Sequence, residues 1–433
     1  MRFQIDVTSG IIIACLVIAA HVLLVLSSKK VSPLAALGAI FLCVAPFSVA
    51  SGLHFVEVIK YVRIYSVGLM FVLAIFMYRL LHFRSSVLFL LGYLLFSLLA
   101  TAWSENPSQA FLFKTQPLIT IMSGVFLANS ADSPDKVRHI LRVLLFGVLA
   151  YAILIWIEMV ANPYSAATGG RLHAFGMNAN RIGQSAAPCL LLAAFVALYD
   201  SVKKWRIFGY GLGAMLLVIV ISSGSRGAVG EALVGLLIMA IPLAKRPLFL
   251  CFAFVAATTA GVLLQGYVLD KAANRLTDTE LTQTNRAEPW SEAWGHFVDS
   301  PIYGQGWVFK TYKREKGSRS NMHSIYLQAL AETGLIGFFL LMNACLFAGF
   351  RYLWMYLNNR RATGGETIVY FGAAITAAVM AHGVIEYGTV TGTAINAIVF
   401  GFGVGLIDRL RQWSVQRRQS SMASMDQSHS LAF

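Results

Sequence analysis

Charged residues are scarce in this chain of 433 residues. They make up 12% of the sequence, whereas a soluble domain carries about 25%. Hydrophobic residues make up 57%, and the mean hydropathy is +0.67. These values exclude a single water-facing globule. Most of the length is taken up by apolar runs of about 20 residues, which is the span of a bilayer core, so no separate soluble domain is expected.

Cysteine is rare as well, and the motifs of several enzyme classes are missing. No Gly-x-x-x-x-Gly-Lys-Ser/Thr loop is present, so we expect no direct use of ATP. The sequence contains no Cys/His cluster of the kind that binds zinc. The pair Asp278 and Glu280 is more typical of a solvated stretch than of a divalent cation site. We therefore predict neither a metal nor a cofactor. All the cysteines lie in apolar runs and are interpreted as small buried side chains: Cys15, Cys43, Cys189, Cys251 and Cys345.

A series of apolar segments predicts an all-α, polytopic integral membrane protein with about 12 transmembrane helices. The segments are Gly10–Ser28, Pro33–Ala50, Ile64–Leu81, Val87–Trp103, Pro117–Ala128, Ile140–Val160, Ile182–Tyr199, Ile207–Ser222, Ala228–Leu243, Leu248–Val268, Ser324–Leu357, Thr367–Ile385 and Thr389–Ile407. The first two are either two spans or a short hairpin, which leaves a count of about 13 open. Lys29 and Lys30 follow the first segment without a cleavage site, so we expect that segment to be retained.

Basic residues in the short loops predict the orientation of these spans. They gather in alternate loops, which we place in the cytoplasm, and the formal net charge of +14 is largely this topology signal rather than a nucleic-acid surface. These residues are Arg79, Arg84, Lys136, Arg138, Arg142, Lys203, Lys204, Arg206, Lys245, Arg246, Arg360 and Arg361, followed by Arg409, Arg411, Arg417 and Arg418 of the tail.

One outward loop is long, and it divides the chain. We predict N-terminal transmembrane helices over residues 1–268, a large outward loop over 269–323, C-terminal transmembrane helices over 324–408 and a cytoplasmic tail over 409–433. The tail is expected to be disordered after Trp413. The shorter outward loops are Ser104–Gln116, Ala161–Arg181, Ser223–Gly227 and Glu386–Gly388.

A short helix is predicted inside the long loop, over Pro289–Val298. Trp290, Ala293, Trp294 and Phe297 share one of its faces. A face rich in tryptophan suits the membrane interface. Packing of the same face against the protein's own spans is an equal alternative.

Positive residues on the outward side are mostly arginines. Arginine stays charged and binds phosphate oxygens through a planar fork, so arginines that converge from different loops would form a phosphate or pyrophosphate site. Contacts with lipid head groups or local salt bridges are the alternative. Arg226 is the strongest candidate, because the tight turn Ser222–Gly227 also offers backbone amides to an anion. The outward basic residues are Arg171, Arg181, Arg226, Arg286, Arg319 and one short-loop lysine, Lys114.

His323 opens the predicted helix that closes the long loop. A helix N-terminus disfavours a cation, so a neutral imidazole there is suited to act as a general base; a structural histidine is the alternative. Tyr326 lies on the same helix face, whereas Glu332 lies on the opposite face and is expected to pack against a neighbouring span. His382 and Glu386, four residues apart, form a second candidate pair.

Three stretches of the chain resemble the O-antigen ligase and O-antigen polymerase superfamily. The segment His323–Gly337, with the sequence His-Ser-Ile-Tyr-Leu-Gln-Ala-Leu-Ala-Glu-Thr-Gly-Leu-Ile-Gly, resembles its hallmark. Upstream, Asn285–Trp290 and Pro301–Gly306 resemble its loop motif, and Ser225–Gly227 resembles a third feature. Together with the hydropathy profile, the resemblance covers most of the chain.

The resemblance implies a multi-pass enzyme of the bacterial inner membrane with a GT-C-like glycosyltransferase bundle and an active site facing the periplasm. Ligases of this kind transfer a glycan from undecaprenyl diphosphate to a sugar hydroxyl of lipid A–core, and polymerases transfer it to another lipid-linked repeat unit. The implied partners are this lipid-linked donor, the lipid A–core acceptor and membrane lipid, without a metal.

An O-antigen ligase is the expected member, because the chain lacks the extra outward C-terminal domain of the protein-glycosylating relatives. A polymerase is the alternative. A transporter is less expected, since the sequence shows no internal duplication.

Roles for individual residues follow from the resemblance. Arg226 and Arg286 would stabilise the charge that develops on the departing diphosphate in place of a metal. His323 would accept the proton of the acceptor hydroxyl, or orient that hydroxyl, as it attacks the anomeric carbon from the opposite face, which inverts the configuration. The candidates for binding the diphosphate or the glycan are Arg171, Arg181, Arg319, Tyr326, Trp290 and Trp294.

Overall fold

A computed structural model describes residues 32–50, 53, 56–76, 85–162, 171–243, 287–307, 322–358, 366–386, 395–407 and 409–410. Over these residues the fold is all-α, with no β-strand. Seven of the helices are long and apolar enough to cross a membrane. The predicted class, a polytopic membrane protein, is therefore confirmed, and the count of spans stays a prediction. The predicted spans Gly10–Ser28 and Leu248–Val268 and nearly all of the tail lie outside the described residues.

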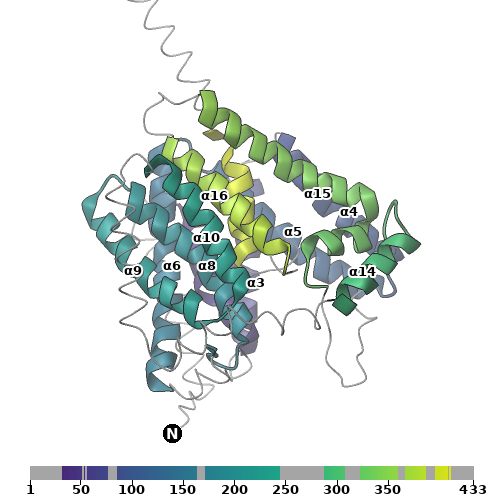
Figure 1. Cartoon of the computed structure of the whole chain (residues 1–433), viewed down its shortest axis with the longest axis horizontal. Coiled ribbons are helices and arrows are strands. Elements are labelled where there is room, and N and C mark those ends of the chain that lie inside the picture. The colour runs from purple at the N-terminus through teal and green to yellow at the C-terminus, as the bar shows by residue number, and fades with distance from the viewer. Residues whose placement is uncertain are drawn as a thin grey trace, which may run out of the picture.

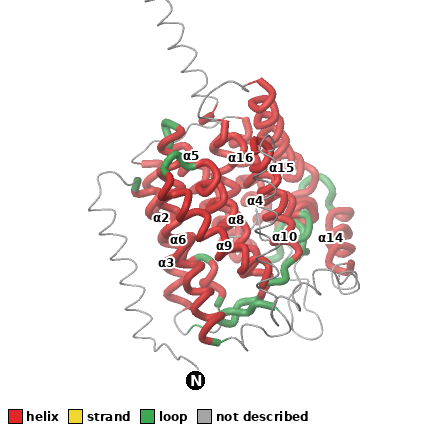
Figure 2. Tube along the Cα trace, turned by 60° about the vertical axis from the view of Figure 1, so that its left-hand side comes forward, coloured by secondary structure: helices red, strands yellow, loops and turns green. Residues whose placement is uncertain are grey.

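Most of the described chain is helical (Figures 1 and 2). In chain order the helices are α2 (Pro33–Val44), α3 (Val56–Phe76), α4 (Ser85–Leu99), α5 (Pro107–Asn129), α6 (Pro134–Ala161), α8 (Ala179–Tyr199), α9 (Lys203–Ser222), α10 (Arg226–Ala240), α14 (Ala287–Asp299), α15 (Ile325–Asn358), α16 (Glu366–Gly383) and a last helix over Ile395–Ile407. Short 3-10 turns follow α2, α4 and α10 at Pro46–Val49, Ala100–Trp103 and Ile241–Leu243.

Polar caps begin several of these helices earlier than the hydropathy pattern predicts. The Asn106 side chain accepts a hydrogen bond from the Gln109 amide (3.3 Å), and Pro107 occupies the first helical turn. As a result α5 begins at Pro107, and most of the predicted outward loop Ser104–Gln116 is helical. That prediction was wrong because apolar windows detect the bilayer-spanning part of a helix and miss its polar first turns.

Figure 1 shows two groups of helices side by side. One group contains α6, α8, α9, α10 and α16, and the other contains α4, α14 and α15. In the second group, the rings of Phe89 and Phe347 stack with centroids 5.2 Å apart, and Arg351 donates to the Ser85 hydroxyl (3.0 Å). Contacts between α15 and α16 connect the two groups.

A break in α15 separates its first turns from the rest of the helix. Gly334 has a φ of +59°, which is non-helical, and the loop after α14 fills the gap. The Leu335 amide donates to the Pro301 carbonyl (2.8 Å), and the Ala331 carbonyl accepts from the Gln305 amide (2.9 Å). The loop therefore satisfies backbone groups that the break leaves without helical partners. The predicted continuous helix from Ser324 is corrected accordingly: it begins at Ile325 and is kinked.

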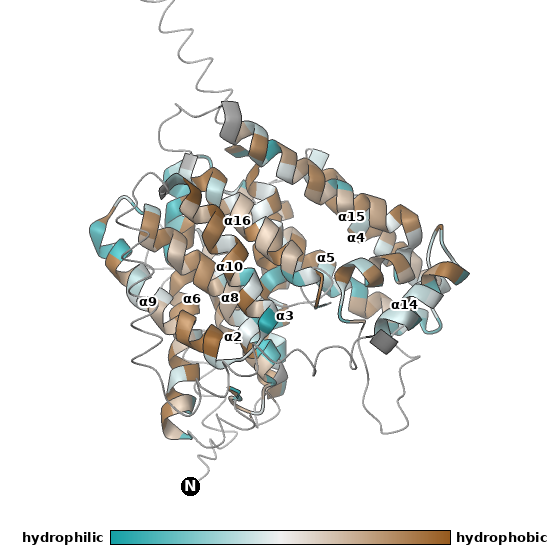
Figure 3. Cartoon of the chain, in the orientation of Figure 1, coloured by the Kyte–Doolittle hydropathy of each residue, from teal (hydrophilic) through white to brown (hydrophobic). Residues whose placement is uncertain are grey.

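The short helix predicted in the long loop is confirmed as α14. Ala293 is fully buried and packs with Met322 and Ala331, whereas Trp294 is 52% exposed. Figure 2 shows α14 at the edge of the molecule beside α15, and Figure 3 shows hydrophilic residues along it. One side of α14 therefore packs against the rest of the protein, and the side that carries Trp294 is exposed.

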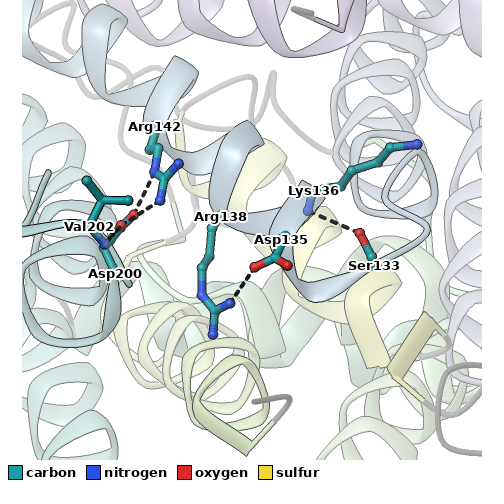
Figure 4. A network of polar contacts seen from close by, with 7 residues as sticks. All are labelled: Ser133, Asp135, Lys136, Arg138, Arg142, Asp200 and Val202. Atoms are coloured by element: carbon teal, nitrogen blue, oxygen red, sulfur yellow. Dashed lines mark hydrogen bonds and ion pairs between the residues drawn. The ribbon is translucent and has the colours of Figure 1, made fainter. Parts of the chain in front are cut away.

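The end of the bundle that carries Arg138, Arg142 and the α8–α9 turn, here called the basic-loop end, is held by ion pairs (Figure 4). Arg142 donates to both carboxylate oxygens of Asp200 (2.7 and 2.6 Å), and Asp200 also accepts from the Val202 amide (2.8 Å). Arg138 pairs with Asp135 (2.7 Å). These residues belong to the loops predicted to be cytoplasmic, and that orientation stays a prediction.

Candidate active site

The turn between α9 and α10 places Arg226 at the first residue of α10. Ser225 caps the helix, since its hydroxyl accepts from the Ala228 amide (3.4 Å). The Ser223 hydroxyl donates to the Val220 carbonyl (2.6 Å) and accepts from the Ser225 amide (3.2 Å). Arg226 is half-buried. A helix N-terminus that also carries an arginine is suited to bind an anion.

Arg171 lies against the same turn. Its Nε donates to the Ser223 carbonyl (3.0 Å), and one of its Nη atoms donates to the Asn180 side-chain oxygen. Both acceptors are neutral, so these bonds hold the guanidinium without cancelling its charge. Burial lowers the pKa of His173, and the positive charge of Arg171 lowers it further, while the backbone hydrogen bond with Met177 partly opposes both. The structure thus brings two of the predicted arginines to one turn.

Arg181 lies in the first turn of α8, where it is exposed. It interacts electrostatically with Arg63 of α3, whose guanidinium donates to the Ser48 hydroxyl (2.8 Å). Sequence reasoning missed Arg63 because the predicted span began one residue later, at Ile64. The available signal was an arginine inside a largely apolar helix, where a charge is costly and often functional.

His323 lies two residues before α15, with a φ of +48°. Residues other than glycine seldom adopt this conformation, although histidine does so more often than most, and such outliers cluster at active sites. Its Nδ1 lies 3.5 Å from a carboxylate oxygen of Glu386. The His323 side chain is 30% exposed and that of Glu386 is 12% exposed, so this pair is within reach of solvent.

A close contact between α10 and the end of α16 brings Arg226 near this pair. Gly227 follows Arg226, and a Cβ added to it would lie 2.8 Å from His382 Nε2 and 3.0 Å from Ile385 Cδ1. Ile385 directly precedes Glu386. The structure therefore brings Arg226 and His323 to the same region from segments far apart in the sequence.

The predicted pairing of His382 with Glu386 is wrong. Helix α16 ends at Gly383, so Glu386 is not on the same helix face as His382. His382 instead contacts Glu231 of α10, and Glu386 lies beside His323. The sequence analysis missed Glu231, although a lone carboxylate in the apolar run after Ala228 indicates a candidate functional residue.

Glu332 contacts a neighbouring span, as predicted. Its carboxylate pairs with Lys114 of α5, and both side chains are buried. Gln328 donates to the other oxygen of Glu332 (3.0 Å). The pair connects α5 to the first turns of α15, two residues before the break at Gly334.

The remaining predicted site residues have different outcomes. The Tyr326 hydroxyl donates to the Met380 carbonyl (3.0 Å), which joins α15 to α16. Trp290 is half-buried, and the Trp294 ring packs on Phe297 with centroids 5.1 Å apart. Arg286 and Arg319 lie outside the described residues.

An apolar cavity of about 410 Å³ lies between α10, α15 and α16. Tyr326, one turn after His323, lines it together with Cys345, Tyr352, Val369 and Met380. As for metal ligands, the part of the chain that the structure describes holds no group of three or more His, Cys, Asp or Glu residues arranged to bind an ion.

A family model described as O-Antigen ligase matches residues 210–342. The matched segment runs from α9 to α15 and includes Arg226, Glu231 and His323. A search of curated proteins found no match. The family match indicates the activity of an O-antigen ligase or polymerase, which is a glycosyltransferase-like enzyme. Residues 210–342 of this membrane protein therefore match an O-antigen ligase domain, which supports the O-antigen ligase superfamily.

Proposed function

We propose that the protein is an O-antigen ligase of lipopolysaccharide biosynthesis. It would transfer a glycan from undecaprenyl diphosphate to a sugar hydroxyl of lipid A–core, without a metal and with inversion. The observation that carries this proposal is the His323–Glu386 pair beside the start of α10, where Arg226 lies. The enzyme would sit in the bacterial inner membrane, with this site and the loop of residues 269–323 facing the periplasm.

The reaction forms one bond and breaks one bond at the anomeric carbon. The acceptor hydroxyl oxygen attacks that carbon, and the bond to the phosphate oxygen of the donor breaks on the opposite face. The lipid diphosphate leaves with additional negative charge. Arg226 and the positive end of the α10 dipole would stabilise this charge, with Arg171 beside them. Arg181, Arg286 and Arg319 are further candidates for the same role.

His323 would take the proton that the acceptor hydroxyl loses. The nearby Glu386 carboxylate would orient the imidazole through Nδ1 and stabilise the imidazolium that forms. Trp290 and the exposed Trp294 would contact sugar or acceptor lipid.

The apolar cavity supports a lipid-linked donor. It begins one turn after His323 and follows α15 as far as Leu353. A polyprenyl chain lying there would keep its diphosphate near Arg226 while the chain stays in an apolar environment. Tyr326 would line the start of this path.

Product analysis with purified protein tests the proposal. The protein is incubated with undecaprenyl-diphosphate glycan and lipid A–core, and the products are separated by mass. Glycan-capped lipid A–core is the expected product. Longer lipid-linked chains would make the protein a polymerase, which the shared His323 motif allows. Saturable substrate uptake by liposomes without any glycan transfer would instead make it a transporter.

A further inference from the structure

A second histidine–carboxylate pair lies inside the bundle. His382 Nδ1 contacts Glu231, and the Asn396 side-chain amide donates to the same carboxylate oxygen (3.1 Å). The three residues come from α10, α16 and the helix Ile395–Ile407, and each is at most 1% exposed. We call these residues the buried cluster. It lies too deep to touch a substrate.

Burial of a histidine and a carboxylate costs free energy, so packing alone does not explain why these residues occupy the interior. Ionisable side chains inside a membrane protein are expensive, and well-packed apolar residues often give equal or greater stability. A polar cluster does differ from an apolar contact in one respect. It fixes a single geometry, because its hydrogen bonds are directional.

The buried cluster adjoins both halves of the candidate active site. On α10, Glu231 lies one turn after Gly227, and His382 Nε2 faces Gly227 so closely that a Cβ there would clash. Arg226 is the next residue toward the N-terminus. On α16, the His382 carbonyl accepts from the Glu386 amide (3.0 Å), so the same residue holds the turn that carries Glu386 to His323.

We propose that Glu231, His382 and Asn396 are positioning residues that fix Arg226 relative to the His323–Glu386 pair. The proposal rests on the proposed function, in which Arg226 faces the leaving diphosphate and His323 faces the acceptor. In-line displacement requires these two groups on opposite faces of one carbon, and a shift of about 1 Å can cost on the order of 100-fold in rate. The hydrogen bonds of the buried cluster would keep Arg226 and the His323–Glu386 pair at a fixed separation.

A triple apolar variant, Glu231→Leu with His382→Leu and Asn396→Leu, separates positioning from packing. Removing all three partners avoids an unpaired buried charge, so this variant is expected to fold. Transfer is measured per molecule of folded, monodisperse protein. We expect kcat to fall on the order of 100-fold and KM for the donor to rise. The single variant His382→Gln, whose amide can still bind Glu231, should recover most of the activity.

Ser123→Ala is the matched control, since it removes another buried hydrogen bond between helices, from Ser123 to the Val67 carbonyl (3.2 Å). It should leave kcat and KM unchanged. If the triple variant does not fold, Glu231→Gln, which keeps the shape of the side chain, takes its place. A folded variant with the kcat and KM of the wild type would overturn the proposal.

A substrate-free measurement distinguishes failure of this inference from failure of the proposed function. Hydrogen–deuterium exchange is compared for residues 223–231 and 381–386 in the wild type, the triple variant and Ser123→Ala. Faster exchange in both segments of the triple variant alone supports positioning, even if the wild type transfers no glycan. Unchanged exchange in these segments overturns the inference, whatever the activity of the wild type.

Discussion

The two histidine–carboxylate pairs have the same chemistry and different surroundings. His323 and Glu386 lie in connecting segments with side chains 30% and 12% exposed, whereas His382 and Glu231 lie on helices with side chains 0% exposed. Only the first pair is open to an acceptor hydroxyl. We therefore propose a chemical role for the exposed pair and a positioning role for the buried pair, because the two pairs differ in burial and not in residue type.

Glutamine in place of either histidine removes the imidazole but keeps an amide. His323→Gln should lower transfer by about 10²–10⁴-fold, because glutamine cannot take a proton. His382→Gln should keep most activity, because its amide can still bind Glu231. Initial rates of glycan transfer decide between the two, with His139→Ala at the basic-loop end as a control. Equal losses at both positions would show that burial does not separate their roles.

Thermal stability should rank the pairs in the opposite order. His382→Ala leaves the Glu231 carboxylate buried without its partner and should cost about 3–5 kcal/mol. His323→Ala breaks a partly exposed contact and should cost about 0–1 kcal/mol. Unfolding in detergent, followed by fluorescence, measures both variants. Comparable losses of Tm would contradict the assignment of a structural constraint to the buried pair alone.

Variants of Arg226 test whether this residue stabilises the departing diphosphate. Arg226→Ala should lower transfer by about 10²–10³-fold, since one preorganised donor to developing charge is lost. Arg226→Lys should recover only part of the activity, because lysine lacks the planar fork. Arg351→Ala is the matched control, since that arginine binds Ser85 at the far part of α15. Full activity of Arg226→Ala would remove this residue from the mechanism.

Of these variants, Glu386→Gln is expected to have the smallest effect on transfer. The amide preserves the shape of the carboxylate but not its charge, so the rate should fall by about 10-fold, within the contribution of general base catalysis. Glu292→Gln alters another histidine–carboxylate contact, to His296 at 3.8 Å, and serves as control. If both variants have the kcat of the wild type, Glu386 does not orient His323.

The all-α membrane class could be predicted because hydropathy reports directly on helices that cross a bilayer. The short helix α14 could be predicted from Pro289 and the spacing of its aromatic residues. The break at Gly334 could not, because the loop that fills it lies about 30 residues upstream, and no local pattern reports such a contact. The start of α5 was missed because its polar first turns are stabilised by a cap and by the distant Glu332.

In the candidate site, too, local sequence patterns predict individual residues but not their long-range partners. His323, Arg226 and Arg171 could be proposed as candidates because outward arginines and a histidine before a helix are visible in the local sequence. The partners of the two histidines were assigned wrongly or missed, since they depend on which helices meet. Glu386 was matched to His382 by a spacing of four, but α16 ends between them.

In the proposed reaction, glycan transfer needs no metal and depends on His323. The most direct measurement is transfer from undecaprenyl-diphosphate glycan to lipid A–core by purified wild type and His323→Ala, each in the presence of EDTA. We predict glycan-capped lipid A–core from the wild type and none above background from the variant. Loss of wild-type activity with EDTA, or undiminished transfer by His323→Ala, would contradict it.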